Sequence, residues 1–483
     1  MTIQSLAEIT ADYASGVEVS ADEVREAVDA APHQVLIVLD DDPTGTQSVA
    51  GLPVLTRWTE ADLAWAFEQN APAIYVMTNS RSLAPVDAEA INREVADAAF
   101  AAADARGISI SFVSRSDSTL RGHYPLEPDT LADKVEAHGA TVDGFVIVPA
   151  FGDAGRITVG STHYAGSAAE GFKPVGETEF AEDATFGYTN SRLPEWIEEK
   201  TSGAVKATQV LRLDLNVIRA GADAIAEVLV QANDRQPVVP DIVTEDDLRL
   251  LSLGLIKAEA QGKHFIYRVG PPFVRARIGQ DVPAPLTPAR IEAARHSSTQ
   301  GEFAEGGLIV VGSHVPTTTR QLHQLLERNN PAVVELDVRR VLSDGSEVYL
   351  AELVDTVTAK LAAGNVVFHT SRELVKGEDG DESLAIARAV SAALVGAVNQ
   401  VVHRVTPRFV IAKGGITSSD VASKGLEMTR AIVIGPMQPG IISLWTTQEG
   451  PATGVPYIVF AGNVGTDASL AEGVDTLSAS TSS

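Results

Sequence analysis

Short apolar runs alternate with alanine-rich amphipathic stretches along the first half of the chain. The apolar runs cover residues 35–39, 73–77, 108–113, 144–148 and 238–243. Continuous apolar runs separated by helical stretches are typical of strands buried on both faces of a mostly parallel sheet. The pattern predicts an α/β domain, with an N-terminal extension over about residues 1–32.

A second series of apolar runs follows in the other half of the chain. These runs cover residues 307–312, 332–338, 365–370, 408–415, 431–435 and 457–463. Pro, Gly and Ser punctuate residues 271–306, as expected of a connection between domains. We predict two α/β domains, each a mostly parallel sheet flanked by helices, over residues 1–295 and 300–470, with the boundary near 295–305 and a frayed tail over 471–483.

One long stretch fits neither pattern. Residues 152–193 are rich in Gly and Thr and poor in periodicity. Long segments of this kind within a compact domain are usually functional. We expect a long functional loop here, or a cover over a cleft.

Composition narrows the class of protein. The 483 residues include 37 Lys and Arg against 64 Asp and Glu, which gives a formal net charge of −27, and there is no cysteine. A strongly acidic chain repels polyanions, so general nucleic-acid binding is disfavoured. Without cysteine there is no disulfide, thiol nucleophile or cysteine-ligated metal. No run of 18 apolar residues and no signal-peptide pattern is present, so we expect a cytoplasmic protein without a membrane span.

Acidic residues follow the first apolar run. In parallel α/β sheets, ligands bind beyond the carboxyl ends of the strands, so residues after each run are candidates for a site. Asp40, Asp41 and Asp42 follow residues 35–39 on a Pro/Gly turn. Such acids could simply begin the next helix. Three adjacent carboxylates repel one another unless a cation or a hydroxyl-rich group is bound, which favours a ligand site.

Arginines follow the neighbouring runs. Arg81 comes after residues 73–77, and the segment after 108–113 contains Arg115, Ser116, Asp117, Ser118 and Arg121. Arginines at adjacent strand ends can clamp a carboxylate or phosphate in bidentate fashion, while acids accept hydrogen bonds from sugar hydroxyls. This combination predicts a site for a small hydroxy-acid. The alternative is that Arg81 and Arg121 only form ion pairs with Asp41 and Asp117.

The strand ends of the second half are glycine-rich and carry few charges. The residues concerned are Ser313, Gly414, Gly415, Ile416, Thr417, Gly435, Gly462 and Asn463. Backbone N–H groups at such turns, together with helix N-termini, bind anions, and phosphates are the usual occupants. One such turn could merely close a βα unit, but four in one domain predict a nucleotide site. The Walker, Rossmann, zincin and hydrolase-elbow motifs are absent.

Several short motifs, in this order, resemble the four-carbon acid sugar kinases, a family with a sugar-binding half and a nucleotide-binding half. The matching pieces are Asp41–Gly45, Ser80–Arg81, Asp117–Gly122, Ala154–Thr158, Thr178–Phe180, Gly312–Ser313, Gly414–Ser418, Pro439–Gly440 and Gly462–Asn463. The resemblance implies an ATP-dependent kinase that phosphorylates a hydroxyl of a four-carbon acid sugar such as threonate, erythronate or 3-oxo-tetronate. It also implies a ligand cleft between the domains, and Mg²⁺ that bridges the phosphates of ATP. Ile416 departs from the family, which often has Glu there.

The resemblance also implies residue roles. The sugar acid would be held by Asp41, Arg81 and Arg115–Ser118, and ATP by Ser313, Gly414–Thr417 and Gly462. A carboxylate would accept the proton of the attacking hydroxyl, and the candidates for this base are Asp42 and Asp117. Two other classes stay open: a non-catalytic regulator that binds sugar acid or nucleotide, and a phosphatase or aldolase that acts on a sugar-acid phosphate. A homo-oligomer is compatible with the sequence.

Overall fold

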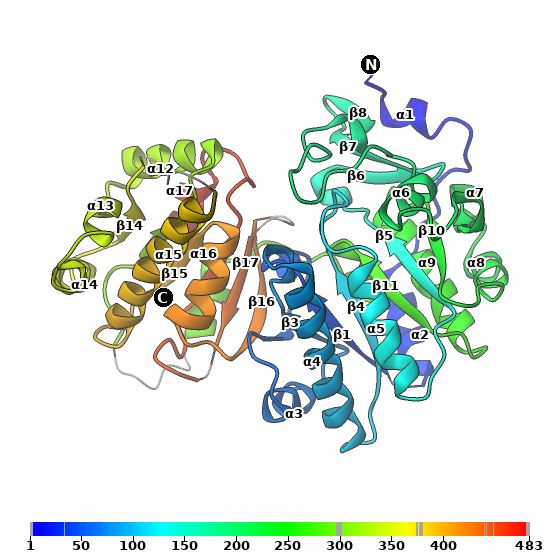
Figure 1. The fold of residues 1–483 in the computed structure, drawn as a ribbon, viewed down its shortest axis with the longest axis horizontal. Helices are drawn as coiled ribbons and strands as arrows, with labels where there is room; N and C mark the ends of the chain where they lie inside the picture. Colours follow the sequence, from blue (N-terminus) through cyan, green and yellow to red (C-terminus); the bar gives the residue numbers. More distant parts are fainter. Residues whose placement is uncertain are drawn as a thin grey trace. The chain divides into compact units, whose positions relative to one another are not determined.

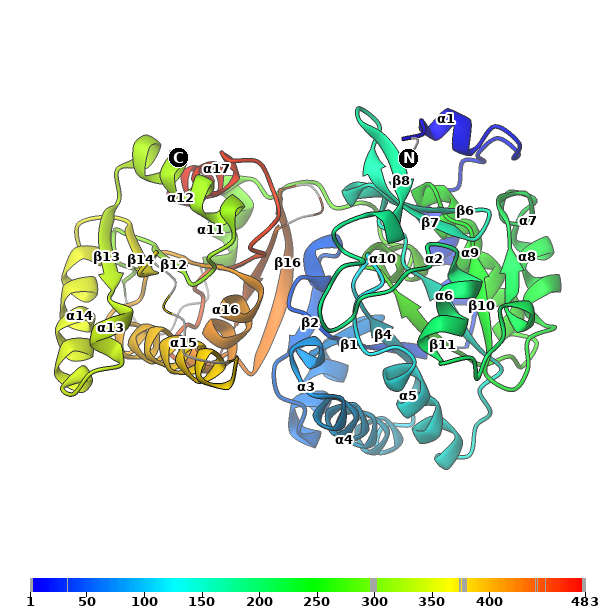
Figure 2. The same cartoon turned by 45° about the horizontal axis from the view of Figure 1, so that its top comes forward.

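The protein's structure is a computed structural model that describes residues 3–32, 34–295, 302–372, 375, 380–438, 440, 442–447 and 449–479. The chain forms two compact units (Figures 1 and 2). Unit 1 comprises Met1–Leu52 and Trp58–Pro283, and unit 2 comprises Pro53–Arg57 and Ala284–Ser483. Both units are of the α/β class, which confirms the predicted fold class.

The central sheet of unit 1 is parallel, with strand order β3-β1-β4-β11-β5-β10-β9. Its strands are β1 (Gln34–Asp40), β3 (Ala73–Met77), β4 (Ser109–Arg115), β5 (Gly144–Val148), β9 (Leu211–Leu213), β10 (Gln236–Pro240) and β11 (Phe265–Val269). Strands β3, β5 and β11 are buried along their whole length. Such burial explains the continuous apolar sequences of β3 and β5, because helices cover both faces of a parallel sheet.

Two groups of helices pack around this sheet. The helices of unit 1 are α1 (Leu6–Ile9), α2 (Ala21–Ala30), α3 (Glu60–Glu68), α4 (Pro85–Asp104), α5 (Leu126–Ala137), α6 (Leu193–Lys200), α7 (Leu215–Arg219), α8 (Ala222–Leu229), α9 (Glu245–Glu259) and α10 (Pro272–Arg277). Helix α4 packs between α3 and α5 (Figure 1). Helices α2, α8 and α10 pack on α9. Ser20, Thr59 and Thr244 begin α2, α3 and α9 with capping boxes, which satisfy backbone N–H groups at the helix start.

The stretch predicted as a long loop contains a small antiparallel sheet instead. Its strands are β6 (Arg156–Val159), β7 (Thr162–Ser167) and β8 (Gly171–Pro174), with β7 in the middle. Glycine allows the strands to approach closely, since a Cβ at Gly166 would lie 2.0 Å from the carbonyl oxygen of Gly171. The apolar residues Ile157, Val159 and Phe172 pack with Leu215 in a small core of their own.

The sheet of unit 2 has strand order β13-β14-β12-β15-β18-β17-β16-β2. Its strands are β2 (Leu52–Leu55), β12 (Leu308–Val311), β13 (Ala332–Leu336), β14 (Val366–Thr370), β15 (Val410–Lys413), β16 (Arg430–Gln438), β17 (Ile442–Thr446) and β18 (Tyr457–Phe460). Strands β12 to β15 and β18 pair in parallel, whereas β17 is antiparallel to both β16 and β18. The sheet is therefore mostly parallel, as predicted. The antiparallel strands at its edge were not predicted.

Segment Pro53–Arg57 belongs to unit 2, although it lies early in the sequence. The backbone N–H of Thr56 donates to the carbonyl oxygen of Thr429 at 3.2 Å, and its hydroxyl donates to the carbonyl of Met428. The chain thus crosses from unit 1 into unit 2 and returns before it completes unit 1.

The division between the units falls between Pro283 and Ala284, earlier than the predicted 295–305. The helices of unit 2 are α11 (Pro288–Arg295), α12 (Pro316–Asn329), α13 (Val338–Val341), α14 (Ser346–Leu361), α15 (Gly380–Val402), α16 (Gly415–Asp420) and α17 (Ser469–Ser478). Helix α11 joins unit 2 because the guanidinium of Arg295 donates to the carbonyl oxygens of Arg408 and Leu477 at 3.2 and 2.7 Å. The prediction of a frayed tail over 471–483 is wrong for the residues of α17, because Leu470, Val474 and Leu477 are fully buried.

Among the residues that the structure describes, one helix is long and apolar enough to cross a membrane by length and composition. Residues Ala385–Val402 of α15 have a mean hydropathy of 1.5. Most residues of their second half are buried, and Leu394, Val398 and Val401 are among them. Core helices of globular proteins share this composition, so α15 is weak evidence for a membrane span.

Candidate active site

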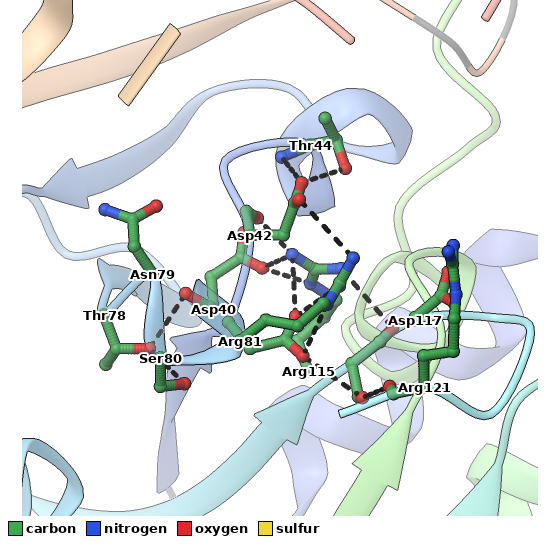
Figure 3. Close-up of polar contacts among 12 residues, drawn as sticks. Asp40, Asp42, Thr44, Thr78, Asn79, Ser80, Arg81, Arg115, Asp117 and Arg121 are labelled. Atoms are coloured by element: carbon green, nitrogen blue, oxygen red, sulfur yellow. Dashed lines mark hydrogen bonds and ion pairs between the residues drawn. The ribbon is translucent and has the colours of Figure 1, made fainter. Parts of the chain in front are cut away.

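The carboxyl ends of β1, β3 and β4 lie in register in unit 1. Asp40 at the end of β1 pairs with Met77 of β3 and with Arg115 of β4. The three segments that follow these strands therefore meet at one edge of the sheet (Figure 3). The predicted grouping of acids and arginines at this edge is what the structure contains.

Asp40 and Arg115 form a fully buried ion pair. Burial lowers the pKa of the Arg115 guanidinium to about 9, which still leaves it protonated at neutral pH. The turn after β1 passes close to this pair: a Cβ at Gly45 would lie 2.3 Å from Asp40 Oδ2 and 2.4 Å from Arg115 Nε. Glycine at position 45 is thus required by space.

Asp41 is buried and held by Arg81 in bidentate fashion. Arg81 Nη2 donates to Asp41 Oδ1 at 2.6 Å and Arg81 Nε donates to Oδ2 at 3.1 Å, while the Ser116 hydroxyl donates to Oδ2 at 3.3 Å. Burial raises the pKa of Asp41 to about 6, against the lowering effect of Arg81. Although burial acts to lower it, the pKa of Arg81 is raised overall by Asp41 and Asp42.

The two candidate bases differ in their partners. Arg121 Nε donates to Asp117 Oδ2 at 2.7 Å, and the Thr119 hydroxyl donates to the same oxygen. Burial raises the pKa of Asp117, but Arg81 and Arg121 outweigh it and hold the pKa at about 2. Asp42 instead accepts hydrogen bonds from Thr44, at 2.6 Å from the hydroxyl and 3.0 Å from the backbone N–H.

Asp42 is the more accessible of the two. Its side chain is 24% exposed, and its second oxygen, Oδ2, has an ion-pair contact with Arg81 Nη1 at 3.4 Å. The side chain of Asp117 is 15% exposed.

The structure contains both ion pairs of the alternative interpretation, Arg81 with Asp41 and Arg121 with Asp117.

Sequence reasoning missed two buried charged residues beneath this edge. Arg268 of β11 pairs with Glu127 of α5, and its Nη1 atom also donates to the Ser114 hydroxyl at 2.7 Å. Gly122 fits above them, since a Cβ there would lie 2.7 Å from Arg268 Nη2. Residues 265–269 are apolar except for Arg268. A charged residue within an apolar run could have indicated a buried ion pair, but it interrupts the apolar pattern, and the strand was therefore not predicted.

Replacing Arg268 by methionine is expected to lower the free energy of unfolding by about 3–5 kcal/mol, because the buried carboxylate of Glu127 loses its partner. Equilibrium urea denaturation measures the change. The double variant Arg268→Met/Glu127→Gln removes both charges and should recover part of the loss. If the single and double variants lose the same free energy of unfolding, the ion pair between Arg268 and Glu127 does not stabilise the fold.

In unit 2, three glycine turns meet at the ends of the adjacent strands β12, β15 and β18. A Cβ at Gly312 would lie 2.3 Å from Thr417 Oγ1, one at Gly414 would lie 3.0 Å from Ser313 Cβ, and one at Gly462 would lie 2.7 Å from Ser313 Oγ. The Thr318 hydroxyl links two of the turns: it donates to the carbonyl oxygen of Gly462 at 2.9 Å and lies 3.1 Å from Ser313 Oγ. We call these turns, with Ser313 and Thr417, the glycine cradle.

The other predicted nucleotide residues lie at varied positions. Gly415 begins α16, Ile416 is 67% exposed beside it, and Asn463 is exposed after β18. Gly435 was predicted to follow the end of a strand. It lies within β16 instead, at an irregularity in the pairing of β16 with β17. The antiparallel hairpin β16–β17 explains the difference, since it extends the strand to Gln438.

Two cations near the glycine cradle were not predicted. Arg372 donates from Nη1 to the carbonyl oxygen of Ser313 and from Nη2 to the Thr319 hydroxyl, both at 2.6 Å. Lys413, at the end of β15, is fully buried, and its ammonium donates to the carbonyl oxygen of Ala461. Burial lowers the pKa of Lys413 to about 7.

The stability of the protein should therefore depend on pH through Lys413. Between pH 7 and 10 the unfolded chain keeps a proton on this lysine that the folded chain has lost, so raising the pH favours the folded state. The stability of the wild type relative to Lys413→Met is expected to rise across this window, measured by urea denaturation at several pH values. The exposed Lys360→Met variant serves as control and should show no such trend.

Among the described residues, no group of three or more His, Asp or Glu side chains is arranged to hold a metal ion. Mg²⁺ usually keeps several waters and takes one or two carboxylates together with substrate phosphates. A site that receives Mg²⁺ with a nucleotide therefore does not require such a group.

Two family models match the chain. One, described as a sugar-binding N-terminal domain, matches residues 36–277, and the other, described as a nucleotide-binding C-terminal domain, matches residues 308–470. D-threonate kinase from Salmonella typhimurium is 25% identical over 345 residues, which cover 70% of this chain and 72% of that kinase.

Solved structures share the fold. A Salmonella typhimurium LT2 protein provisionally described as a tRNA synthase matches with a TM-score of 0.64 and 17% identity, over 91% of this chain and 98% of that one. A Haemophilus influenzae protein of the DUF1537 family matches with a TM-score of 0.57 and 19% identity, over 90% and 98% of the two chains. With both family models matched in order along the sequence, the chain belongs to the four-carbon acid sugar kinase family.

Proposed function

We propose that the protein transfers the γ-phosphoryl group of ATP to a hydroxyl of a four-carbon acid sugar, with threonate, erythronate and 3-oxo-tetronate as first candidates. The observation that carries this proposal is the contrast between the strand ends, which are charged in unit 1 and lined by glycine in unit 2. Alternating carboxylates and guanidiniums suit a polyhydroxylated acid, whereas glycine turns suit phosphates. The similarity to D-threonate kinase supports the same substrate class.

The strand-end residues of unit 1 would line the sugar-acid site. They are Asp41, Asp42, Arg81, Arg115, Ser116, Asp117, Ser118 and Arg121. Their internal ion pairs hold the acids in fixed positions, so the oxygen atoms of the carboxylates are oriented before a sugar binds. Preorganised acceptors lose little entropy when they bind hydroxyls.

ATP fits the glycine cradle of unit 2. The cradle lacks side-chain atoms at the three positions where a Cβ would meet Ser313 or Thr417, so its backbone is open to the close approach of a phosphate. Gly415 begins α16 and adds the N–H groups of the helix start, whereas the exposed Ile416 and Asn463 would border the nucleoside. When bound, ATP supplies the phosphoryl group and brings Mg²⁺ to neutralise its charge.

Asp42 is the better of the two candidate bases. A general base works best when its pKa lies near the operating pH, and the pKa of Asp117 is held at about 2. Asp42 has its Oδ1 atom fixed by Thr44, while its side chain is 24% exposed. Among the described residues, its Oδ2 atom has only a 3.4 Å contact with Arg81 Nη1, so it can also accept a hydrogen bond from a substrate hydroxyl. We therefore propose that Asp42 accepts the proton of the attacking hydroxyl and that Asp117 orients the sugar.

An ATP-consumption screen against four-carbon and five-carbon sugar acids tests the proposed function. ADP formation should require both the sugar acid and Mg²⁺, and a phosphorylated acid should appear in equal amount by mass spectrometry. Release of phosphate or carbon–carbon cleavage from a sugar-acid phosphate in the absence of ATP would instead indicate a phosphatase or aldolase. Binding of acid and nucleotide without turnover would indicate a regulator.

A further inference from the structure

The arginines expected to bind the substrate carboxylate already have carboxylate partners inside the protein. The pairs are Arg115 with Asp40, Arg81 with Asp41 and Arg121 with Asp117. The nearby Arg268, which was not expected to bind substrate, pairs with Glu127. At the edge of the guanidinium that faces the internal acid, a substrate carboxylate could bind only by displacing that acid, and this would leave a buried charge unpaired. These arginines therefore suit the positioning of the acids better than the binding of a new anion.

Arg156, at the start of β6, differs from all of them. No carboxylate of the described residues lies within 4.0 Å of its guanidinium. Nη1 donates to the carbonyl oxygen of Ala154, but the buried Nε atom has no hydrogen-bond partner. Burial lowers the pKa of Arg156, and Asp117 and Glu179 act against this only at longer range. A half-buried guanidinium without a counter-charge is a position where an anion would be stabilised.

Arg156 also borders the sugar-acid residues. Its guanidinium lies 5.5 Å from the centre of the Phe180 ring, and the guanidinium of Arg121 lies 5.4 Å from the same ring. The strand next to β6 is tied to the site loop, because the imidazole of His163 hydrogen-bonds the carbonyl oxygen of Ser118 at 2.7 Å. Arg156 thus lies at the side of the site that carries Asp117 and Arg121.

We propose that Arg156 binds the carboxylate of the sugar acid and so selects acids over neutral sugars, an assignment that rests on the proposed kinase function. The Nε and Nη2 edge has no protein partner among the described residues, and Arg81 uses the equivalent edge to hold Asp41. A carboxylate on this edge would receive two parallel N–H donors. The hydroxyl end of the substrate would then extend toward Asp117 and the other acids of the strand ends.

The test compares Arg156→Gln with the wild type on two substrates: the sugar acid that the wild type phosphorylates best, and the neutral primary amide of that acid. We expect the KM for the acid to rise by about 10-fold to 150-fold, the loss typical of charge-assisted hydrogen bonds, while kcat and the KM for ATP change little. The KM for the amide should hardly change, because the amide has no charge to lose. Arg156→Lys keeps the charge but not the planar fork, so it should give an intermediate KM for the acid.

The exposed Arg212→Gln variant on β9 is the matched control and should behave as the wild type on both substrates. Equal losses on acid and amide, an unchanged KM for the acid, or a raised KM for ATP alone would each overturn the assignment. If the wild type phosphorylates no acid in the panel, the proposed function fails, and calorimetric titration of threonate then tests Arg156 separately. Weaker threonate binding by Arg156→Gln than by Arg212→Gln supports the assignment, whereas equal binding, or none by the wild type, overturns it.

Discussion

Replacing Gly414 by valine is expected to raise the Kd of the protein for ATP by at least about 100-fold, which corresponds to the loss of about two charge-assisted hydrogen bonds. Gly414 has φ = +124°, a conformation that side chains disfavour, and a Cβ there would lie 3.0 Å from Ser313 Cβ and 3.2 Å from Thr417 Oγ1. The branched side chain would therefore occupy the glycine cradle where the phosphates are proposed to bind. Calorimetric titration of ATP with Mg²⁺ measures the change.

Backbone strain at a positive φ could by itself destabilise the Gly414→Val variant and so weaken ATP binding. The control variant must therefore introduce the same kind of strain at a position outside the glycine cradle. Gly345 also has a positive φ, +87°, but no atom lies within 4 Å of its Cβ position. Gly345→Val should therefore lose stability without losing ATP affinity. Similar Kd values for the two variants would contradict the assignment of the glycine cradle. Sugar-acid binding, which is proposed for unit 1, should be unchanged in both.

The sequence was sufficient to predict that the acids and arginines of unit 1 lie close together, because parallel strands that end together bring their following residues together. Asp40 and Arg115 are 75 positions apart, and both their strands were visible as apolar runs. The sequence left open whether Arg81 and Arg121 pair with Asp41 and Asp117, as they do in the structure, and it indicated no partner for Arg115. A reversal of partners between two acids of one turn requires only a small rotation of side chains, and neither periodicity nor composition records it.

The elements that were missed share a physical cause. Strand β11 contains Arg268, whose charge is neutralised by Glu127 far away in the sequence, so its apolar pattern is interrupted. Strands β6 to β8 bury few apolar side chains and depend on close contacts of glycine backbones. Strand β2 leaves the first half of the sequence to join the second unit. Each of these strands is stabilised by residues far away in the sequence or by close backbone contacts, and the pattern of apolar residues along a short segment indicates neither.

Replacing Asp42 by asparagine is expected to lower kcat by about 10²-fold to 10⁴-fold, the range of general-base catalysis. Asparagine has the same shape and can still accept the hydrogen bonds that Thr44 donates at 2.6 and 3.0 Å. It cannot take a proton from the attacking hydroxyl at neutral pH. The KM values for the sugar acid and for ATP should therefore change little. Single-turnover rates at saturating substrates isolate the chemical step from product release.

Asp117→Asn and Thr44→Val separate this role from the alternatives. Asp117→Asn weakens the contact with Arg121, so it should raise the KM for the sugar acid more than it lowers kcat. Thr44→Val removes a hydrogen bond from Asp42 but keeps its carboxylate, so kcat should fall only slightly. If Asp117→Asn slows phosphoryl transfer and Asp42→Asn does not, the base is Asp117 despite its low pKa. If neither slows transfer by about tenfold, well below the range expected of a general base, neither carboxylate accepts the proton, and positioning and charge neutralisation account for the rate.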